Sequence, residues 1–474
     1  MIKKIGINTL LYAVGPQIPK ILGFFMLPIL TSHLTSTDYG MAGIIYAYTG
    51  LLGGIGDLGL HVRLANIYFK SPARWMNPWR QLFGFLSLWA VLFAVLQSVL
   101  LMLVLPAGMG TNRYVIIGLL AVSSIVFTTT INFCYRIFQF SEKAGYITNI
   151  SIVVGVSTLV LNYLTIVQFK LGYLGWFIST FIGSGIQFVF CATHLFGKLK
   201  LFPELNLRKR YIKSTLRVTL PLVPHNYASY ILDSSDRFLL DRMKVSITEI
   251  GRYNFAYMFA GYLDFFVSSL GIAISPTMYK IYYSKAEDRL VQLRTLMIAC
   301  QLLFFFLVFN GGIWLKEFLH VFIRNSELKL VYPLGIIVLV GYTYKPLYWY
   351  VNAILTYNNK TASLWKITFS AALINIILNL LLIPHFSIYA AAWSTLASFL
   401  FLAFLGFSLR DFKEYNTLRF NLVVWLLGFG ALLGVCLLFM DSPVITKLVV
   451  TLAGDALFGW GFYIYYRKLK IFSF

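Results

Sequence analysis

Runs of about twenty apolar residues recur along the whole chain, separated by short breaks that carry charged and turn-forming residues. An α-helix needs about 20 apolar residues to cross a hydrocarbon core about 30 Å thick, because each residue rises about 1.5 Å. The pattern therefore predicts an all-α integral membrane protein with fourteen membrane-spanning helices. The predicted spans are 7–30, 40–60, 82–106, 114–138, 147–169, 172–196, 215–236, 250–275, 291–313, 330–355, 362–384, 387–409, 420–440 and 443–466.

Composition excludes two other classes of protein. Only 12% of the residues are charged and 59% are hydrophobic, whereas a soluble protein carries roughly 25% charged residues. A cytosolic enzyme is thereby ruled out. An outer-membrane barrel would show segments of about ten residues with alternating polarity, and the apolar runs in this chain are about twice that long.

The net charge of +22 is explained by membrane topology. Cytoplasmic loops of membrane proteins collect Lys and Arg. If both termini are cytoplasmic, 27 of the 39 Lys and Arg residues fall on the cytoplasmic side and 10 on the other side. The bias supports fourteen spans with both ends inside, and it makes nucleic acid an unlikely partner for this basic chain.

Cofactor, metal and processing motifs are not found in the sequence. The four cysteines, Cys134, Cys191, Cys300 and Cys436, lie inside apolar runs without metal-ligand spacing, and they are predicted to be small buried hydrophobic residues. The first apolar run lacks a signal-peptide cleavage site, so we expect it to be retained as the first span. The glycine-rich segment 50–56 lacks the Lys-Ser/Thr of a phosphate loop and is predicted to allow close helix packing.

The chain resembles itself at an offset slightly above 200 residues. Residues 161–166 align with 378–383, and the Asp38 turn aligns with the Glu249 turn. Six helices in each copy is an even number, so the two copies should insert with the same orientation and be related by a pseudo-twofold axis along the membrane normal. The predicted segments are a six-helix lobe at 1–200, a second six-helix lobe at 214–410, and helices 13 and 14 at 419–468.

Paired prolines occur at matching places in the two copies. The first span carries Pro16 and Pro19, and the seventh carries Pro221 and Pro224. Matching proline-broken spans in two halves point to a central transport site, since proline removes a backbone donor and kinks the helix. These four prolines are the predicted helix-breaking or gating residues. The residue after the second proline is Lys20 in one copy, and the other copy has a histidine there, His225.

Basic side chains near mid-span suggest an anionic ligand. A charged Lys facing lipid costs roughly 2.5–3.5 kcal/mol on insertion scales, so Lys20 should face protein or water. Lys345 is also mid-span and precedes Pro346. Lys and Arg supply the counter-charge that a pyrophosphate needs inside a membrane. Lys20, Lys345 and His225 are therefore the predicted substrate-binding residues of a cationic cavity, and Asp264, midway through the eighth span, is the candidate for ion coupling.

Two further pairs of charged residues have ordinary interpretations. Asp57 and Arg63 lie near the cytoplasmic end of the second span and are expected to form an interface pair. Asp236 and Arg237 lie at the outer end of the seventh span, where a local ion pair is expected.

Several short patterns together resemble a known family. The chain is similar to polysaccharide-exporting flippases of the Wzx type, in the multidrug/oligosaccharidyl-lipid/polysaccharide exporter superfamily. The resemblance covers nearly the whole chain and rests on segments at Asn8–Leu10, Leu34–Gly40, Gly56–Gly59, Asp236–Arg237, Glu249–Tyr253 and Asn379–Trp393.

The resemblance implies a function and a location. It implies two six-helix lobes around a central cavity, alternating access, and flipping of undecaprenyl-pyrophosphate-linked oligosaccharide across the bacterial inner membrane for surface polysaccharide such as O-antigen, capsule or exopolysaccharide. Family members carry cationic lumen residues, which map to Lys20 and Lys345. The expected partners are this lipid-linked oligosaccharide, membrane lipids, a polysaccharide polymerase and a chain-length regulator. No cofactor is expected. Either an ion gradient, with H+ or Na+ as the candidate coupling ion, or the downhill use of the product would drive transport.

Two alternatives of different classes remain. A multidrug/cation antiporter of the same superfamily would need only twelve helices and an acidic cavity. A membrane glycan polymerase or ligase would carry a large outer loop with catalytic Arg or His, whereas all predicted loops in this chain are short. The sequence therefore favours a transporter over an enzyme.

Overall fold

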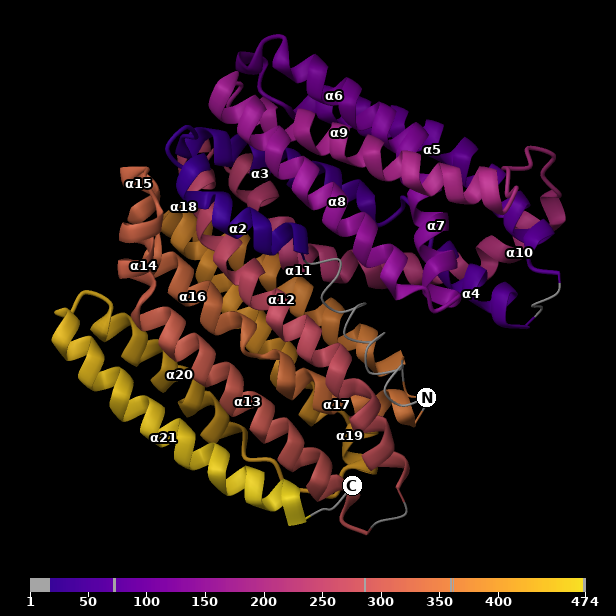
Figure 1. The fold of residues 1–474 in the computed structure, drawn as a ribbon. Coiled ribbons are helices and arrows are strands. Elements are labelled where there is room, and N and C mark those ends of the chain that lie inside the picture. The colour runs from indigo at the N-terminus through magenta and orange to yellow at the C-terminus, as the bar shows by residue number, and fades with distance from the viewer. Residues whose placement is uncertain (1–17, 71–73, 285–286, 359, 361, 472–474) are drawn as a thin grey trace. The chain divides into compact units, whose positions relative to one another are not determined.

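The computed structural model describes residues 18–70, 74–284, 287–358, 360 and 362–471. Every regular element in these residues is a helix (Figure 1), which confirms the predicted all-α class. The chain packs as two compact units, unit 1 from Met1 to Tyr230 and unit 2 from Ile231 to Phe474. The predicted segments 1–200, 214–410 and 419–468 were defined by the sequence repeat, whereas the two units are defined by packing. The predicted segments therefore stay a prediction.

Unit 1 is built from antiparallel helices, several of which change pitch along their length. Three π-helical turns, labelled η3 to η5, continue the α-helices that precede them. Such turns are rare and often lie at functional sites. The elements of unit 1 are α2 (Ile18–Leu30), α3 (Ser36–Gly53), α4 (Leu60–Lys70), α5 (Met76–Val104), η2 (Ala107–Met109), α6 (Asn112–Val122), η3 (Ser123–Thr128), α7 (Thr129–Phe140), α8 (Ala144–Asn162), η4 (Tyr163–Gln168), α9 (Tyr173–Ala192), η5 (Thr193–Lys198), α10 (Lys209–Thr219) and η6 (Leu220–Leu222).

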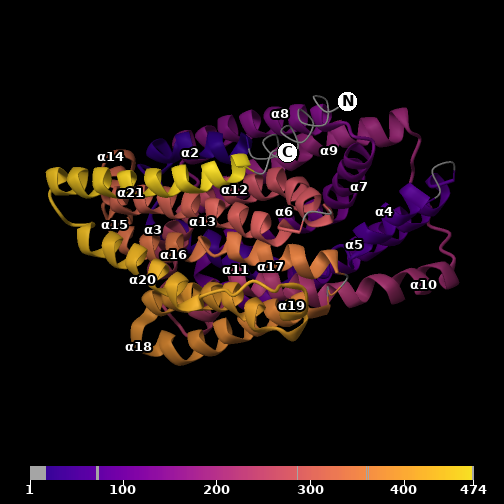
Figure 2. The same ribbon diagram turned by 90° about the horizontal axis from the view of Figure 1, so that it is seen from below.

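Unit 2 begins inside α11 (Val223–Arg242) and continues to the C-terminal end. Its last two long helices are α20 (Leu422–Phe439) and α21 (Val444–Ile471), and α21 lies along α13 (Arg289–Ile313) in both views (Figures 1 and 2). The other elements of unit 2 are α12 (Ile247–Tyr283), α14 (Leu315–Phe322), α15 (Ser326–Lys329), α16 (Tyr332–Tyr342), α17 (Lys345–Tyr357), α18 (Ala362–Ser408) and α19 (Arg410–Tyr415).

Helices make up most of every predicted span in the described part of the chain, with breaks inside the predicted spans 40–60 and 330–355. Among those residues, eight helices are long and apolar enough to cross a membrane, and α2 is a shorter apolar helix. The 47-residue α18 is two helices that meet at a kink, where Ser387 has φ 49° and ψ −130°. The kink separates the predicted spans 362–384 and 387–409, as expected. The chain is therefore a multi-pass membrane protein.

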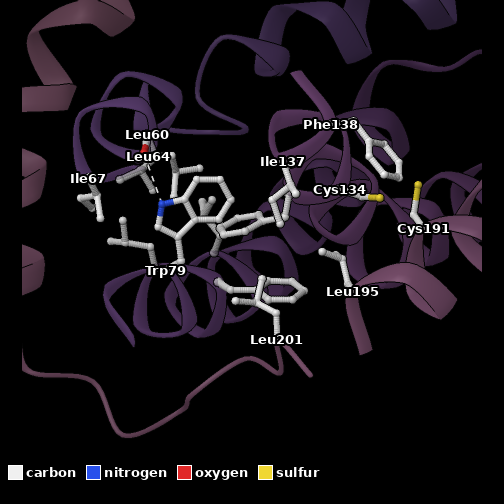
Figure 3. Packing of buried hydrophobic residues seen from close by; sticks show 14 of the residues in the cluster. Leu60, Leu64, Ile67, Trp79, Cys134, Ile137, Phe138, Cys191, Leu195 and Leu201 are labelled. Carbon is white, nitrogen blue, oxygen red and sulfur yellow. Dashed lines mark hydrogen bonds between the residues drawn. The ribbon is translucent and has the colours of Figure 1, made fainter. Parts of the chain in front are cut away.

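One end of unit 1 has an aromatic core around Trp79. The Trp79 side chain is fully buried, and its indole N–H donates a hydrogen bond of 3.2 Å to the carbonyl of Leu64 (Figure 3). Phe83 and Phe133 stack beside it with ring centroids 4.6 Å apart. Cys134 and Cys191 lie in the same core, and all four cysteines are buried and free, as predicted.

The same contact between an acid and a turn occurs in both units. Asp38 in α3 accepts a hydrogen bond of 2.9 Å from the backbone N–H of Tyr173, next to the left-handed Gly172 that starts α9. In unit 2, Glu249 in α12 accepts a hydrogen bond of 3.2 Å from the hydroxyl of Ser387, the left-handed residue in α18. The sequence repeat had paired Asp38 with Glu249, so the two units share a structural detail as well as a pattern.

The C-terminal helices are fixed to unit 2 by a buried ion pair. Lys447 in α21 is fully buried, and its ammonium lies 2.8 Å from each carboxylate oxygen of Glu317 in α14. The same ammonium donates to the carbonyls of Ile313 and Met440. A buried Lys is tolerated only when it is paired and hydrogen-bonded, and here these four acceptors surround it.

Candidate functional site

The predicted residues Lys345 and Asp264 are brought together in unit 2. The Lys345 ammonium donates to the Asp264 carboxylate, and the two side chains are 17% and 32% exposed. Lys345 also lies 5.4 Å from the ring centroid of Tyr342. The sequence predicted separate roles for these two residues, substrate binding for Lys345 and ion coupling for Asp264, whereas in the structure each is the partner of the other.

A break in the tenth predicted span places Lys345. Helix α16 ends at Tyr342 and α17 begins at Lys345, with Pro346 in its first turn. Proline there removes a backbone donor, so carbonyls of the preceding turn need another partner. The buried side chain of Gln301 supplies one by donating a hydrogen bond of 2.9 Å to the carbonyl of Thr343. The break is thus stabilised by a specific polar contact.

A further acidic side chain, that of Asp233, lies near this pair. Asp233 in α11 is exposed and lies close enough to Lys345 and Asp264 to interact electrostatically with both. One helical turn onward, Asp236 is fully buried. A cationic cavity was predicted around Lys345, but the structure places the carboxyl groups of Asp264 and Asp233 near it.

Asp236 is held by uncharged donors. Its carboxyl oxygens accept hydrogen bonds of 2.6 Å from Tyr253, 2.6 Å from Thr395 and 2.7 Å from Asn379. These donors come from α12 and from both halves of α18, so the carboxyl group joins three long helical segments.

The expected ion pair between Asp236 and Arg237 is not formed. Adjacent residues of a helix project about 100° apart and do not face each other. Arg237 instead donates to Asn254 and to the carbonyl of Asp233, and its guanidinium lies 4.2 Å from the ring centroid of Tyr257. The buried network around Asp236 was missed for this reason.

Two of the four predicted prolines lie at a change of helix, and the gating role of all four stays a prediction. The seventh predicted span is divided into α10, the 3-10 turn η6 that contains Pro221, and α11, which has Pro224 in its first turn. Pro19 is a residue of α2 and is so close to Gly155 in α8 that a Cβ atom on Gly155 would come within 3.0 Å of the proline ring. Pro16 lies outside the described residues.

The structure gives less information on the other two predicted cationic residues, Lys20 and His225. Lys20 is an exposed residue of α2, and no described carboxylate lies within ion-pair distance of it. The backbone of His225 belongs to α11, but its side chain lies outside the described part of the structure. The substrate-binding roles of Lys20, Lys345 and His225, and the coupling role of Asp264, stay predictions.

Unit 1 contains a polar site that the sequence interpretation assigned differently. Asp57 was paired with Arg63, but its carboxylate lies 2.9 Å from Nδ1 of His61 in the first turn of α4. Arg63 instead lies over the ring of Tyr211, 5.9 Å from its centroid. Helical spacing could not have shown this contact, because Asp57 lies in the break before α4 and the chain between the two residues is left-handed at Leu58 and Gly59.

Close packing of the glycine-rich segment is confirmed. A Cβ atom on Gly50 would come within 2.4 Å of the Tyr230 ring, and one on Gly54 within 2.9 Å of the Tyr227 ring. Within the described residues, no group of three or more His, Cys, Asp or Glu side chains is placed to hold a metal ion.

Comparison with known families decides the identity of the chain. A family model described as polysaccharide biosynthesis protein matches residues 5–282, more than half of the 474 residues. The chain belongs to this family. No curated protein matches it.

Solved structures with the same fold are flippases and multidrug transporters. The lipid II flippase MurJ in an inward closed conformation has a TM-score of 0.68 and 16% identity, with 97% of this chain and 99% of that chain covered. An inward-facing multidrug resistance transporter of the MATE family, from the MOP superfamily, has a TM-score of 0.65 and 11% identity over 85% and 96% of the two chains. A variant of the Vibrio cholerae MATE transporter VcmN reaches 0.52 with 13% identity, over 87% and 96%. The polysaccharide biosynthesis protein described here therefore has the fold of the MOP superfamily.

Proposed function

We propose that this membrane protein is a flippase for undecaprenyl-pyrophosphate-linked oligosaccharide. In this proposal it moves repeat units across the bacterial inner membrane by alternating access, with both termini cytoplasmic, and supplies surface polysaccharide biosynthesis. Membership of the polysaccharide biosynthesis family and the fold shared with a lipid II flippase support a lipid-linked substrate. A polymerase and a chain-length regulator would use the product.

The observation that carries the proposal is the Lys345–Asp264 pair at the break between α16 and α17. Ionisable residues inside membrane spans are costly and mark substrate or ion pathways. Broken helices in transporters commonly form such sites, because their freed backbone groups are tolerated only where protein or water satisfies them.

The pair also offers a route to coupling. A diphosphate that approaches Lys345 competes with Asp264 for the ammonium, since phosphate oxygens are strong charge-assisted acceptors. Asp264 would then lose its counter-ion and gain affinity for H+ or Na+. Lys20 and His225 would add positive charge along the path, and the proline-containing turns would allow the helices to bend.

The experiment is complementation of a deletion strain at matched protein levels. We expect the deletion to accumulate lipid-linked oligosaccharide on the cytoplasmic side and to lose surface polysaccharide. Lys345→Met and Lys20→Ala should lower export, while Lys413→Ala, an exposed cation in α19 outside the predicted spans, should not. Unchanged export by Lys20→Ala would remove Lys20 from the mechanism, and normal export in the deletion would refute the flippase proposal.

One observation favours a second candidate function. The surroundings of Lys345 include the carboxyl groups of Asp233 and Asp264, and an acidic site suits a cationic drug. A multidrug/cation antiporter would raise resistance to cationic drugs on overexpression, and Asp233→Asn would abolish that resistance. A polysaccharide flippase would leave resistance unchanged.

A further inference from the structure

Unit 1 holds a cavity of about 330 Å³ whose walls carry both charged and neutral polar groups. It lies between the break that joins α3 to α4, helix α5, and the continuous helix that runs from η3 into α7. Its polar lining is formed by Asp57, His61, Ser124, Thr128, Asn132 and Arg136. None of these residues belongs to the Lys345 site, which is in unit 2.

Backbone geometry presents these groups to the cavity. Between α3 and α4 the chain leaves the helix, with left-handed conformations at Leu58 (φ 50°) and Gly59 (φ 69°). The N–H of Gly59 donates a hydrogen bond of 2.9 Å to Asp57 Oδ1. The indole of Trp89 donates one of 2.9 Å to the carbonyl of Ile55. The break is thus held open by specific contacts, as unwound membrane segments require.

The opposite wall is a π-helical turn. In η3 the hydroxyl of Thr128 donates a hydrogen bond of 3.0 Å to the carbonyl of Ser123, five residues earlier. Ser124 in the same turn donates one of 3.1 Å to the side chain of Gln97. Both hydroxyl oxygens keep lone pairs that can accept hydrogen bonds from a ligand.

Charge in the cavity is balanced. Asp57 and His61 form a pair 2.9 Å apart, and Arg136 lines the same space without an ion pair to a described carboxylate; its guanidinium donates to Gln139. The Asp57 carboxylate disfavours a phosphate, and the Arg136 guanidinium disfavours a cation. A neutral ligand with several hydroxyl groups suits this wall, because each hydroxyl can donate to Asp57 and accept from Arg136 or Asn132.

Apolar groups complete the cavity. The rings of Phe93 and Phe133 line it, and aromatic rings pack against the C–H face of a sugar. Small-molecule sites occupy about 300–1,000 Å³, so this volume suits a ligand of one or two sugar rings. We propose that the cavity is a subsite for a neutral sugar residue. The inference rests on the proposed function for its biological meaning, since a sugar would arrive as part of the lipid-linked oligosaccharide.

The test measures sugar binding to the full chain. The protein is placed in lipid nanodiscs, which avoids sugar-based detergents, and saturation-transfer NMR is recorded with methyl hexosides and methyl N-acetylhexosaminides. Inorganic pyrophosphate and tetramethylammonium serve as anionic and cationic probes. We expect a glycoside to bind, and Asn132→Leu and Arg136→Met each to weaken it by about tenfold, the effect of one lost hydrogen bond to a charged or buried group.

The matched control is Asn149→Leu, the same substitution at a residue that lines a separate cavity of unit 1. It should leave glycoside binding unchanged. If Asn132→Leu or Arg136→Met does not fold, Thr128→Val and Asp57→Asn test the same cavity. The inference is overturned if no glycoside binds, if the cavity variants bind as the natural protein does, or if pyrophosphate or tetramethylammonium binds there in place of sugar.

The complementation experiment separates this inference from the proposed function. Glycoside binding that the cavity variants weaken supports the subsite even if surface polysaccharide does not depend on the protein. Loss of polysaccharide in the deletion strain, with no glycoside binding to the purified protein, refutes the subsite and retains the flippase.

Discussion

The carboxylate of Asp38 accepts a hydrogen bond of 2.9 Å from the backbone N–H of Tyr173, 135 residues later in the chain. Its other oxygen accepts hydrogen bonds from the N–H and hydroxyl of Thr35, 2.8 and 2.7 Å away, in a capping box at the start of α3. One acid therefore both begins a helix and fixes the turn that begins α9.

Gly172 should not tolerate a side chain, because of this contact. Its φ is +54°, and a Cβ atom there would come within 2.6 Å of Asp38 Oδ1. We expect Gly172→Ala to lower the free energy of unfolding by at least about 1 kcal/mol, measured as a lower melting temperature in detergent. Gly118→Ala is the control, since a Cβ atom in that helix meets nothing within 4 Å. Equal melting temperatures for the two variants would contradict the prediction.

The attachment of α21 should depend on Lys447 and Glu317 as a pair. Lys447→Met leaves Glu317 without its counter-ion, and breaking a buried pair costs about 3–5 kcal/mol, less here because Glu317 is 29% exposed. The double variant Lys447→Met/Glu317→Leu should recover much of the lost stability. The measurement is thermal unfolding of both single variants and the double variant. A double variant no more stable than Lys447→Met would show that the pair is not the cause.

The buried carboxyl group of Asp236 should be important for the stability of unit 2. Asp236→Ala leaves the donors of Tyr253, Asn379 and Thr395 without their acceptor, and each unsatisfied buried group costs about 1–3 kcal/mol. We expect a loss of about 3 kcal/mol or more, seen as poor yield and a lower melting temperature. Thr395→Val removes one donor alone and should cost less. A milder effect for Asp236→Ala than for Thr395→Val would count against the network.

Asp441 should make stability depend on pH in the acid range. Hydrogen bonds from Lys316 (2.6 Å) and Tyr332 (2.8 Å) hold the pKa of this loop carboxyl below its ordinary value. Its stabilising effect is present above the unfolded pKa of about 3.9 and is lost as pH falls through the lower folded pKa.

The measurement for Asp441 is the melting temperature between about pH 5 and pH 2. Asp441→Asn should show a shallower decline than the natural protein. The difference should be under about 1 kcal/mol, because the pair is largely exposed and solvent screens it. Parallel curves for the two proteins would show that the pair does not contribute.

Much of the fold follows from hydropathy, because lipid requires every backbone polar group to be satisfied within helices. The break near Ser387 and the division at Pro221 were predictable from polar or proline residues between apolar runs. The separation of α3 from α4 was not predictable, because a glycine-rich segment such as 50–56 is compatible with close helix packing and also with a break in the helix. In the structure this segment packs closely, and the break begins within it. No feature of the sequence told these two outcomes apart.

The candidate site was predicted less completely than the fold. Lys345 and Asp264 were both selected for being ionisable at mid-span, but their contact joins α12 to α17, and hydropathy carries no information on which helices meet. The partner of Asp236 was misassigned because adjacency in sequence was taken for proximity in space, whereas Asp57 pairs with His61, which is nearer in sequence than the predicted Arg63. A carboxyl group buried among Tyr, Asn and Thr side chains has no motif, since its donors come from three separate segments.

The left-handed residue inside α18 is Ser387, whereas the residue with similar backbone angles at the start of α9 in unit 1 is a glycine, Gly172, with φ 54° and ψ −137°. A serine at φ 49° and ψ −130° occupies a region that is nearly restricted to glycine. Ser387 thus has an unfavourable backbone conformation, and its hydroxyl makes one hydrogen bond with Glu249. Protein engineering could use this difference: a glycine at that one position would give a more heat-resistant preparation for crystallisation.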